Sequence, residues 1–462
     1  MTQETLHRTR KFWDYINPTF VFFALLFVFA VYSIFLALKL QQHILPDETA
    51  HFAFSEHFST TLGIPKDTPE TYIYGWYIKQ NPFLYYWVSG RALNVLNLVI
   101  SGASEWKKIV FLRLLSVMYS MGTVVFCYLI AKEIIKHKWW QLLPVFLLTN
   151  TLMFVFLSAG VSYDNLANLF SFVSLYFFIR VMNGKDYLSN SIGWILFICL
   201  GTLVKYPILP LALAMGSAWI IFTVLKRASI FPLKISRPKL ILPGIFTALV
   251  IIGNLAIYGV NLLTYQSVTP ACNDLLVKDQ CELSPYVIRY REIALDDEMT
   301  VLESIQLGYP DPIEYVIYSW IPNMLYRIYG ILAHLSYFPS HIITLYQLLF
   351  FWYLLLAFRY WKQHSFTIYS LVGIFLFYTL VLFYTNYTSE LTYGFKQIAL
   401  QGRYIFPVIG ALYILIGSLF TIIQNRNLRF ITLLITLALF FYGGPIKFLI
   451  LRDTVFIDWF IK

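Results

Sequence analysis

The chain has 462 residues, of which 59% are hydrophobic, 19% aromatic and only 13% charged, and its mean hydropathy is +0.66. Soluble domains carry roughly 25% charged residues, so this composition excludes a soluble globular protein and indicates a polytopic membrane protein. The formal net charge of +10 fits basic loops that face anionic lipid, and it requires no nucleic-acid partner.

Apolar runs long enough to cross the membrane follow one another along most of the chain. The N-terminal stretch "MTQETLHRTRKFW" is polar and basic and precedes a run of full spanning length, so we expect no cleavable signal peptide. The runs near the ~20 residues that span a bilayer lie at 18–40, 109–131, 139–158, 165–182, 240–262, 341–360, 366–387, 402–423 and 428–448.

One further run, at 191–225, is too long for a single helix. It is interrupted at "LVKYPILP", where Pro207 lacks a backbone donor and disfavours helix at Tyr206. We therefore expect two helices that meet near Lys205. The sequence predicts an all-α polytopic membrane protein with about 11 transmembrane helices.

Basic residues in short loops predict the orientation of these helices. If the N-terminus is cytoplasmic, half of the 34 Lys and Arg residues lie in cytoplasmic segments, whereas the opposite loop "SAGVSYDN" holds none. Residues 41–108 and 263–340 then form two long external segments. Each contains an aromatic-rich stretch, which we expect to be an interfacial helix because Tyr and Trp favour the membrane interface.

The predicted organisation has three parts and one disulfide. A transmembrane core with the first external loop covers 1–262, the second external loop covers 263–340, and C-terminal transmembrane helices cover 341–462. Cys272 and Cys281 share the second loop, and a disulfide between them is plausible in an oxidising compartment.

An acidic cluster follows the first predicted helix, in "PDETAHF". Asp47 is a candidate general base and Glu48 a second carboxylate, while His51 lies one helical turn on and is able to orient them or contact a phosphate. Carboxylates also stabilise the start of a helix, so the cluster alone is equally well explained as the beginning of an interfacial helix.

Three more ionisable residues are predicted on the same side of the membrane. Asp164 lies at the start of a helix after Ser162, Lys205 lies at the helix break, and Arg403 lies where the tenth predicted helix begins. Charged groups near the membrane are functional candidates because their burial is costly unless they are paired. Separately, they are also explained as a helix-dipole carboxylate, a snorkelling lysine and an interface anchor.

Carboxylates and cations at the external end of a helix bundle suit sugar transfer from a polyprenyl-phosphate carrier. The acceptor hydroxyl needs a base, and the departing phosphate needs cations. A transporter or flippase for lipids or glycans is the alternative, because the same charges would line a pathway. Three adjacent carboxylates at 296–298, Asp296, Asp297 and Glu298, are equally well a solvated acidic face or part of a divalent-metal site.

These motifs resemble the GT-C superfamily of polytopic glycosyltransferases, and more narrowly a bacterial membrane family catalogued as a domain of unknown function. The segments that carry the resemblance run in order from residue 46 to 412: "PDETAHF", "QNPFLYYW", "VSYDNLANL", "LVKYPILPL" and "QGRYIFPVIGAL". The resemblance implies a bacterial cytoplasmic membrane, an extracytoplasmic active site, a polyprenyl-phosphate sugar donor, an acceptor that is a glycan, glycolipid or protein, and no cofactor.

The resemblance also implies roles for individual residues. A catalytic carboxylate in the first external loop falls on Asp47, with Glu48 beside it, and a second acidic residue falls on Asp164. Lys205 and Arg403 are candidates for the donor phosphate. Relatives tend to have a double proline after a His, Glu or Lys, where this chain has "YIKQNPF", so a phosphate or acceptor role for Lys79 or Gln80 is an open expectation.

Overall fold

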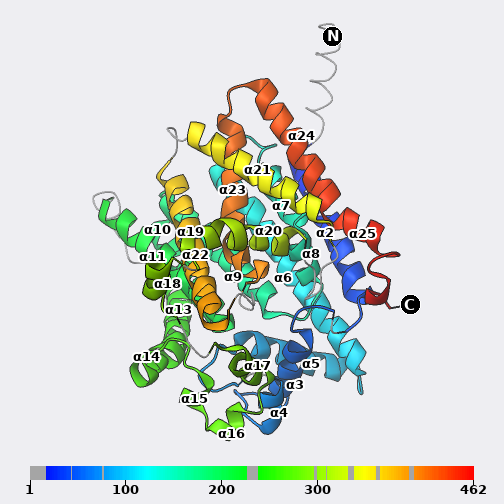
Figure 1. Ribbon diagram of the computed structural model, residues 1–462, viewed down its shortest axis with the longest axis vertical. Coiled ribbons are helices and arrows are strands. Elements are labelled where there is room, and N and C mark those ends of the chain that lie inside the picture. Colours follow the sequence, from blue (N-terminus) through cyan, green and yellow to red (C-terminus); the bar gives the residue numbers. More distant parts are fainter. Residues whose placement is uncertain are drawn as a thin grey trace.

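The computed structural model of the protein confirms the all-α fold class (Figure 1). The described residues form helices and connecting turns, with one antiparallel bridge between Leu40 and Phe460. The structure describes residues 17–42, 44–74, 77–225, 238–295, 299–308, 310–330, 338–360, 365–394 and 400–461.

Within the described ranges, 10 helices are long and apolar enough to cross a membrane. Six are single α-helices: α2 (Pro18–Lys39), α6 (Glu105–Ile134), α9 (Tyr163–Met182), α10 (Tyr187–Val204), α21 (Ser340–Arg359) and α22 (Phe366–Tyr393). Four are composite: Tyr206–Leu225 includes α11 (Leu209–Leu225), Ile241–Tyr265 includes α13 (Ile241–Asn254) and α14 (Val260–Tyr265), Gly402–Ile422 includes α23 (Phe406–Ile422), and Arg426–Leu451 includes α24 (Arg426–Gly443) and α25 (Pro445–Leu451).

The predicted count of about 11 is not confirmed, because the run at 139–158 divides into two short helices. These are α7 (Leu142–Thr149) and α8 (Leu152–Ser158). Asn150 and Thr151 lie between them and donate side-chain hydrogen bonds to the carbonyls of Phe146 and Leu147, both at 2.8 Å. Short polar side chains that bond to nearby backbone favour helix ends over helix interiors.

The predicted break near Lys205 is present. Helix α10 ends at Val204, and Lys205 has extended backbone angles, φ −156° and ψ 128°. A 3₁₀ turn at Tyr206–Ile208 then leads into α11. Pro207 within this turn has no backbone N–H, so continuing α10 through it would cost hydrogen bonds. The break places a lysine between two membrane helices.

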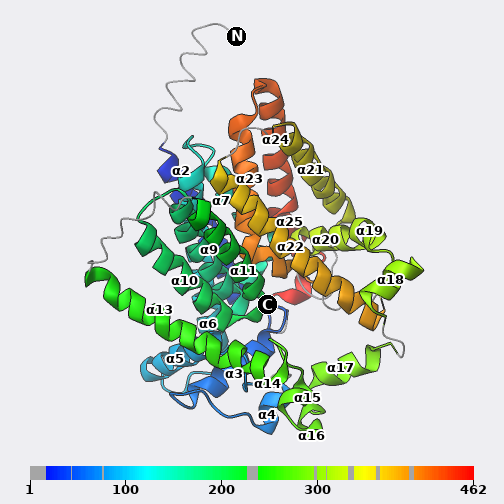
Figure 2. The same cartoon turned by 90° about the vertical axis from the view of Figure 1, so that its left-hand side faces the viewer.

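Short helices occupy the two long segments that were predicted to be external. The first contains α3 (Glu48–Ser59), α4 (Pro69–Ile73) and α5 (Leu84–Val99). The second contains α15 (Cys272–Leu275), α16 (Lys278–Cys281), α17 (Pro285–Ile293), α18 (Val301–Leu307), α19 (Pro312–Glu314), a π-helix (Tyr315–Trp320) and α20 (Ile321–Tyr329). Figures 1 and 2 show α3, α4, α5, α15 and α16 gathered at one end of the molecule, so the two segments meet there.

Helices α9 and α23 form the centre of the bundle, and they are the most buried of the long apolar helices. Their close approach depends on Gly410, because a Cβ atom there would lie 2.4 Å from the ring of Phe172. Asp164 lies in the first turn of α9, and Arg403 lies in the 3₁₀ turn Gly402–Ile405 that leads into α23. The two central helices therefore bring a carboxylate and a guanidinium toward the same place.

The orientation inferred from the basic loops gives a labelling prediction. Leu62 is in the first long segment and His137 follows α6, and both side chains are exposed. In intact cells, a Leu62→Cys variant should react with a membrane-impermeant thiol reagent, whereas a His137→Cys variant should react only after the cells are opened. The opposite pattern would reverse the orientation.

Candidate active site

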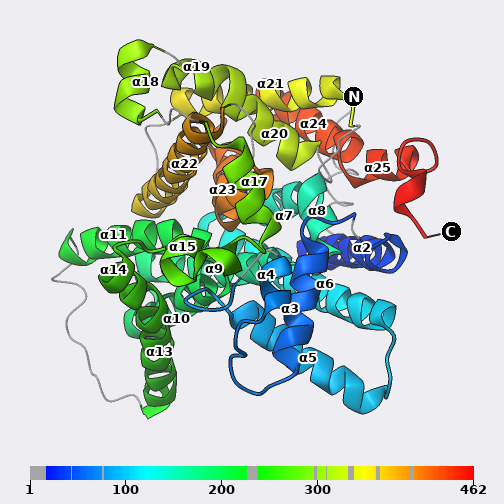
Figure 3. The same ribbon diagram turned by 60° about the horizontal axis from the view of Figure 1, so that its bottom comes forward.

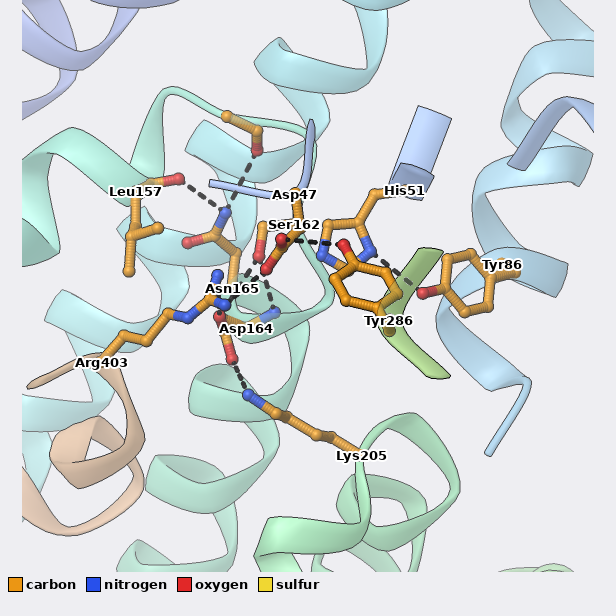
Figure 4. A network of polar contacts seen from close by, with 11 residues as sticks. Asp47, His51, Tyr86, Leu157, Ser162, Asp164, Asn165, Lys205, Tyr286 and Arg403 are labelled. Atoms are coloured by element: carbon orange, nitrogen blue, oxygen red, sulfur yellow. Dashed lines mark hydrogen bonds and ion pairs between the residues drawn. The ribbon is translucent and has the colours of Figure 1, made fainter. Parts of the chain in front are cut away.

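Four charged side chains from distant parts of the chain form one cluster (Figure 4). Arg403 Nη2 lies 2.5 Å from Asp47 Oδ2, and Lys205 Nζ lies 2.5 Å from Asp164 Oδ1. Arg403 Nη1 lies 3.7 Å from Asp164 Oδ2, so it links the two pairs. The structure thus brings together four residues that the sequence had placed only on a common side of the membrane.

Each of the four side chains comes from the end of a helix or from a short turn. Asp47 precedes α3 and has φ 58° and ψ 12°, the left-handed region that residues other than glycine rarely adopt. Asp164 follows the N-cap Ser162, whose hydroxyl accepts from the Asp164 N–H at 3.2 Å. Lys205 lies at the break after α10, and Arg403 lies in a 3₁₀ turn. These helix ends and turns bring the four charges into contact with one another.

Burial separates Asp47 from the other three. The side chains of Asp164, Lys205 and Arg403 are 4%, 6% and 2% exposed, whereas that of Asp47 is 18% exposed. The Lys205 ammonium is also enclosed by the rings of Tyr163 and Tyr404, each with its centroid 4.5 Å away. Buried charges are costly unless paired, so the pairing stabilises the cluster and leaves Asp47 as its most accessible member.

Asp47, Lys205 and Arg403 line a cavity of about 1050 Å³. Tyrosine side chains make up much of its wall near the charges, among them Tyr86, Tyr163 and Tyr404. A second part of the wall is apolar, formed by Leu209, Pro210 and Leu213 of α11 and by Val381 and Leu382 of α22. The cavity thus has a charged part of its wall, and an apolar part that is formed by two membrane helices.

Tyr286 of α17 contacts the same cluster, and no pattern in the sequence had indicated this contact. Its hydroxyl donates to Asp47 Oδ1 at 3.2 Å (Figure 4). Burial, together with the nearby Asp47 charge, raises the pKa of Tyr286 to about 12, so the phenol stays protonated at neutral pH. Asp47 therefore contacts Arg403 through one oxygen and a phenol through the other.

Glu48 faces away from this cavity, into a fully buried pair with Arg113 of α6. Arg113 Nε and Nη2 donate to the two carboxylate oxygens at 2.8 and 2.6 Å, and the Val161 N–H donates to Oε1 at 3.0 Å. Neither side chain lines the cavity. Glu48 was a candidate second carboxylate for catalysis, and the structure assigns its oxygens to Arg113 and the backbone.

The structure does not place the other predicted phosphate contacts in the cavity wall. His51 is buried behind it, with Nδ1 3.0 Å from the Tyr86 hydroxyl, and burial lowers its pKa to about 3, so the imidazole is neutral. Lys79 Nζ donates to the Leu275 carbonyl at 3.0 Å, and the Gln80 carbonyl accepts from Asn261 at 3.1 Å. Lys79 thus links the two long segments, and Gln80 links the first of them to α14.

The predicted pair of cysteines is joined in the structure. Cys272 and Cys281 form a disulfide that ties α15 to α16. The acidic run Asp296, Asp297 and Glu298, considered as a metal site, lies outside the described residues. Among the residues that are described, no group of three or more His, Cys, Asp or Glu side chains is arranged to hold a metal ion.

One family model matches part of the chain. A family model described as dolichyl-phosphate-mannose-protein mannosyltransferase matches residues 81–258, a range that contains Asp164 and Lys205. No curated protein matches the chain in sequence.

Solved structures give a wider likeness. An Archaeoglobus fulgidus oligosaccharyltransferase, in complex with Zn and sulfate, has a TM-score of 0.51 and 14% identity, over 91% of this chain and 52% of that one. ArnT from Cupriavidus metallidurans bound to undecaprenyl phosphate has a TM-score of 0.48 and 14% identity, over 90% of this chain and 62% of that one. The arabinosyltransferase EmbB from Mycobacterium smegmatis has a TM-score of 0.45 and 12% identity, over 88% of this chain and 31% of that one. The chain thus spans less than two thirds of the length of these proteins, and its fold is similar to that of the oligosaccharyltransferase.

Proposed function

We propose that the protein is a membrane glycosyltransferase that moves a sugar from a polyprenyl-phosphate carrier to an acceptor on the extracytoplasmic face. The acceptor is a glycan, a glycolipid or a protein. The observation that carries the proposal is the cavity in which Asp47, Lys205 and Arg403 meet beside an apolar wall. A lipid-linked phosphate needs both of these surfaces, because its chain is apolar and its head is anionic. The matched family and the fold agree with this chemistry.

Asp47 is the proposed general base. It is the most accessible carboxylate of the cluster and lies in the cavity wall, where an acceptor hydroxyl can reach it. Glu48 is a poor alternative because both of its oxygens accept hydrogen bonds in a fully buried pair. This difference favours one of two adjacent carboxylates that the sequence could not separate.

Lys205 and Arg403 are the proposed cations for the donor phosphate. As the acceptor oxygen bonds to the anomeric carbon, the bond from that carbon to the phosphate oxygen breaks, and its electron pair leaves with the carrier phosphate. The acceptor proton passes to Asp47. Cations fixed beside the departing oxygen stabilise the developing charge. A single displacement of this kind inverts the anomeric centre, and the sugar is already activated by its phosphate, so no cofactor is required.

Asp164 has a positioning role in this proposal. It contacts Lys205 at 2.5 Å and Arg403 at 3.7 Å, and it lies behind the cavity wall. When a phosphate binds, the cations exchange part of their contact with carboxylates for contact with phosphate oxygens. Asp164 then keeps both side chains aimed at the cavity.

The donor-phosphate contacts give a binding prediction. Charge-assisted contacts to phosphate contribute roughly 1.5–3 kcal/mol each, so Lys205→Met and Arg403→Ala should each weaken binding of undecaprenyl phosphate about tenfold or more. Binding is measured by fluorescence titration of protein that elutes as a folded species in detergent. Lys108→Met is the matched control, because it removes a cation that pairs with Glu56 and does not line the cavity, so its affinity should equal that of the wild-type protein. Unchanged affinity in both cation variants would remove them from the phosphate site.

The function itself is tested by incubating the purified protein with radiolabelled polyprenyl-phosphate sugars and a membrane extract. Appearance of label in an acceptor that carries no polyprenyl chain supports a transferase. Movement of labelled carrier across reconstituted vesicles without any transfer would instead support the alternative, a lipid or glycan flippase. The Asp47→Asn variant serves as the control for the chemical step.

A further inference from the structure

Helix α17 brings a third cation, Arg289, into the cavity wall. Arg289 comes from the second long segment, whereas Lys205 and Arg403 come from the ends of membrane helices. Seen from the end of the molecule where α3, α4 and α5 lie, α17 crosses the middle of the molecule (Figure 3). Arg289 is neither the proposed base nor one of the proposed contacts to the donor phosphate.

Arg289 differs from the other two cations because, among the described residues, it has no carboxylate partner. Lys205 and Arg403 are each 2.5 Å from an aspartate oxygen. Within the part of the chain that the structure describes, Arg289 has no ion pair, and its guanidinium lies against two rings, 5.3 Å from the centroid of Tyr286 and 5.1 Å from that of Tyr290. Aromatic faces hold a guanidinium by cation–π attraction and leave its five N–H donors available. The cavity thus contains a preoriented donor group with no anion to bind.

The position of Arg289 relative to Asp47 indicates which substrate it serves. Asp47 Oδ2 faces Arg403 and the membrane helices, whereas Oδ1 accepts from the Tyr286 hydroxyl at 3.2 Å. An acceptor hydroxyl must also donate to this carboxylate, so the phenol marks a place suited to it. The ring of Tyr286 in turn contacts Arg289. Arg289 therefore lies one tyrosine ring from the proposed acceptor position.

We infer that Arg289 binds an anionic group, a phosphate or a carboxylate, that the acceptor carries close to the hydroxyl receiving the sugar. The inference rests on the proposed function and narrows its acceptor to one that carries an anionic group. Both anionic groups suit a guanidinium, which binds them through two parallel hydrogen bonds. The carrier phosphate meanwhile occupies Lys205 and Arg403, so donor and acceptor anions have separate cations.

Binding of small probes tests the inference without turnover. Saturation-transfer NMR at low salt compares glycerol 3-phosphate with glycerol, and glucuronate with glucose. The wild-type protein should bind at least one anion about tenfold more tightly than its neutral partner, Arg289→Gln should lose this preference, and Arg289→Lys should keep part of it. The pair that shows the preference identifies phosphate or carboxylate. Absence of any preference in the wild-type protein, or its persistence in Arg289→Gln, would overturn the inference.

Arg291→Gln is the matched control for these measurements. Arg291 lies on the same helix, pairs with Glu282 at 2.8 Å and does not line the cavity. It should bind all four probes as the wild-type protein does. Loss of anion preference in Arg291→Gln would show that the effect reflects the charge of α17 as a whole, and would also overturn the inference.

Transfer assays separate this inference from the proposed function. In a membrane extract, Arg289→Gln should raise the KM for acceptor about tenfold and leave the affinity for undecaprenyl phosphate unchanged. Weaker carrier binding with an unchanged acceptor KM would move Arg289 to the donor side. If the wild-type protein binds anions through Arg289 yet transfers no sugar, the proposed function fails and the anion site stands. If it transfers sugar and Arg289→Gln behaves as wild type, the function stands and the inference fails.

Discussion

Replacement of Asp47 by asparagine should abolish most sugar transfer while the protein inserts and folds normally. General-base catalysis contributes roughly 100- to 10,000-fold, and asparagine keeps the shape of the side chain but cannot take the acceptor proton. The side-chain oxygen of asparagine can still accept from the Tyr286 hydroxyl. The rate of transfer from radiolabelled carrier, measured at equal amounts of folded protein and saturating donor, should therefore fall by two orders of magnitude or more.

Two further variants make the Asp47 result specific. Glu56→Gln changes an exposed carboxylate on α3 that pairs with Lys108, so its rate should equal that of the wild-type protein. Tyr286→Phe removes the phenol that contacts Asp47 Oδ1 and should change the rate much less than Asp47→Asn, because the carboxylate is retained. Near-normal turnover by Asp47→Asn would show that this turn begins α3 without taking part in the chemistry.

Sequence patterns predicted those parts of the fold that depend on local chemistry. Pro207 has no backbone N–H wherever it lies, so the break at Lys205 followed from the sequence. Apolar runs likewise indicated most of the membrane helices, because a helix that crosses lipid needs apolar side chains along its length. The run at 139–158 was misread because most of its residues are apolar, whereas its break depends on hydrogen bonds of two polar side chains, Asn150 and Thr151.

The site was predictable where a charge had to be buried. Asp164, Lys205 and Arg403 stood out because an ionisable group next to apolar helices needs a partner, and the structure makes them partners of one another or of Asp47. The same reasoning applies to Arg113, which lies within a predicted span and was overlooked. Its presence there was the available signal for the pair with Glu48.

Other site residues had no signal in the sequence. Tyr286 and Arg289 belong to a polar segment rich in tyrosine and arginine, and only the packing of α17 over the cavity distinguishes them from their neighbours. The spacing of His51 from Asp47 predicted that it orients the carboxylates or contacts a phosphate, and this role stays a prediction. Burial behind Tyr86 leaves its imidazole neutral and outside the cavity wall.

The buried pair of Glu48 and Arg113 should contribute strongly to the stability of the folded protein. All five N–H groups of Arg113 are used: three go to the carbonyls of Ala37, Leu40 and Gln41 around the end of α2, and two go to Glu48. Both side chains are fully buried. The pair thus joins the end of α2, the start of α3 and the middle of α6.

Removing one partner of a buried pair leaves an uncompensated charge and typically costs about 3–5 kcal/mol. Arg113→Met should therefore lower the yield of folded protein sharply, and it also deprives three backbone carbonyls of their donor. Glu48→Gln should be destabilising as well, since an amide cannot neutralise the guanidinium. The measurement is the thermal midpoint of unfolding in detergent, with Glu56→Gln as the matched control on the same helix. That exposed pair should contribute about 1 kcal/mol or less.

The rate per folded molecule then separates the adjacent carboxylates. Glu48→Gln should lower the thermal midpoint strongly and the rate of the remaining folded protein only modestly, because Glu48 affects Asp47 through the backbone turn that they share. Asp47→Asn should show the reverse, a large loss of rate with a small change in midpoint. A stable Glu48→Gln protein without activity would move the general base to Glu48, and would mean that the catalytic state exposes a carboxylate that Arg113 holds here.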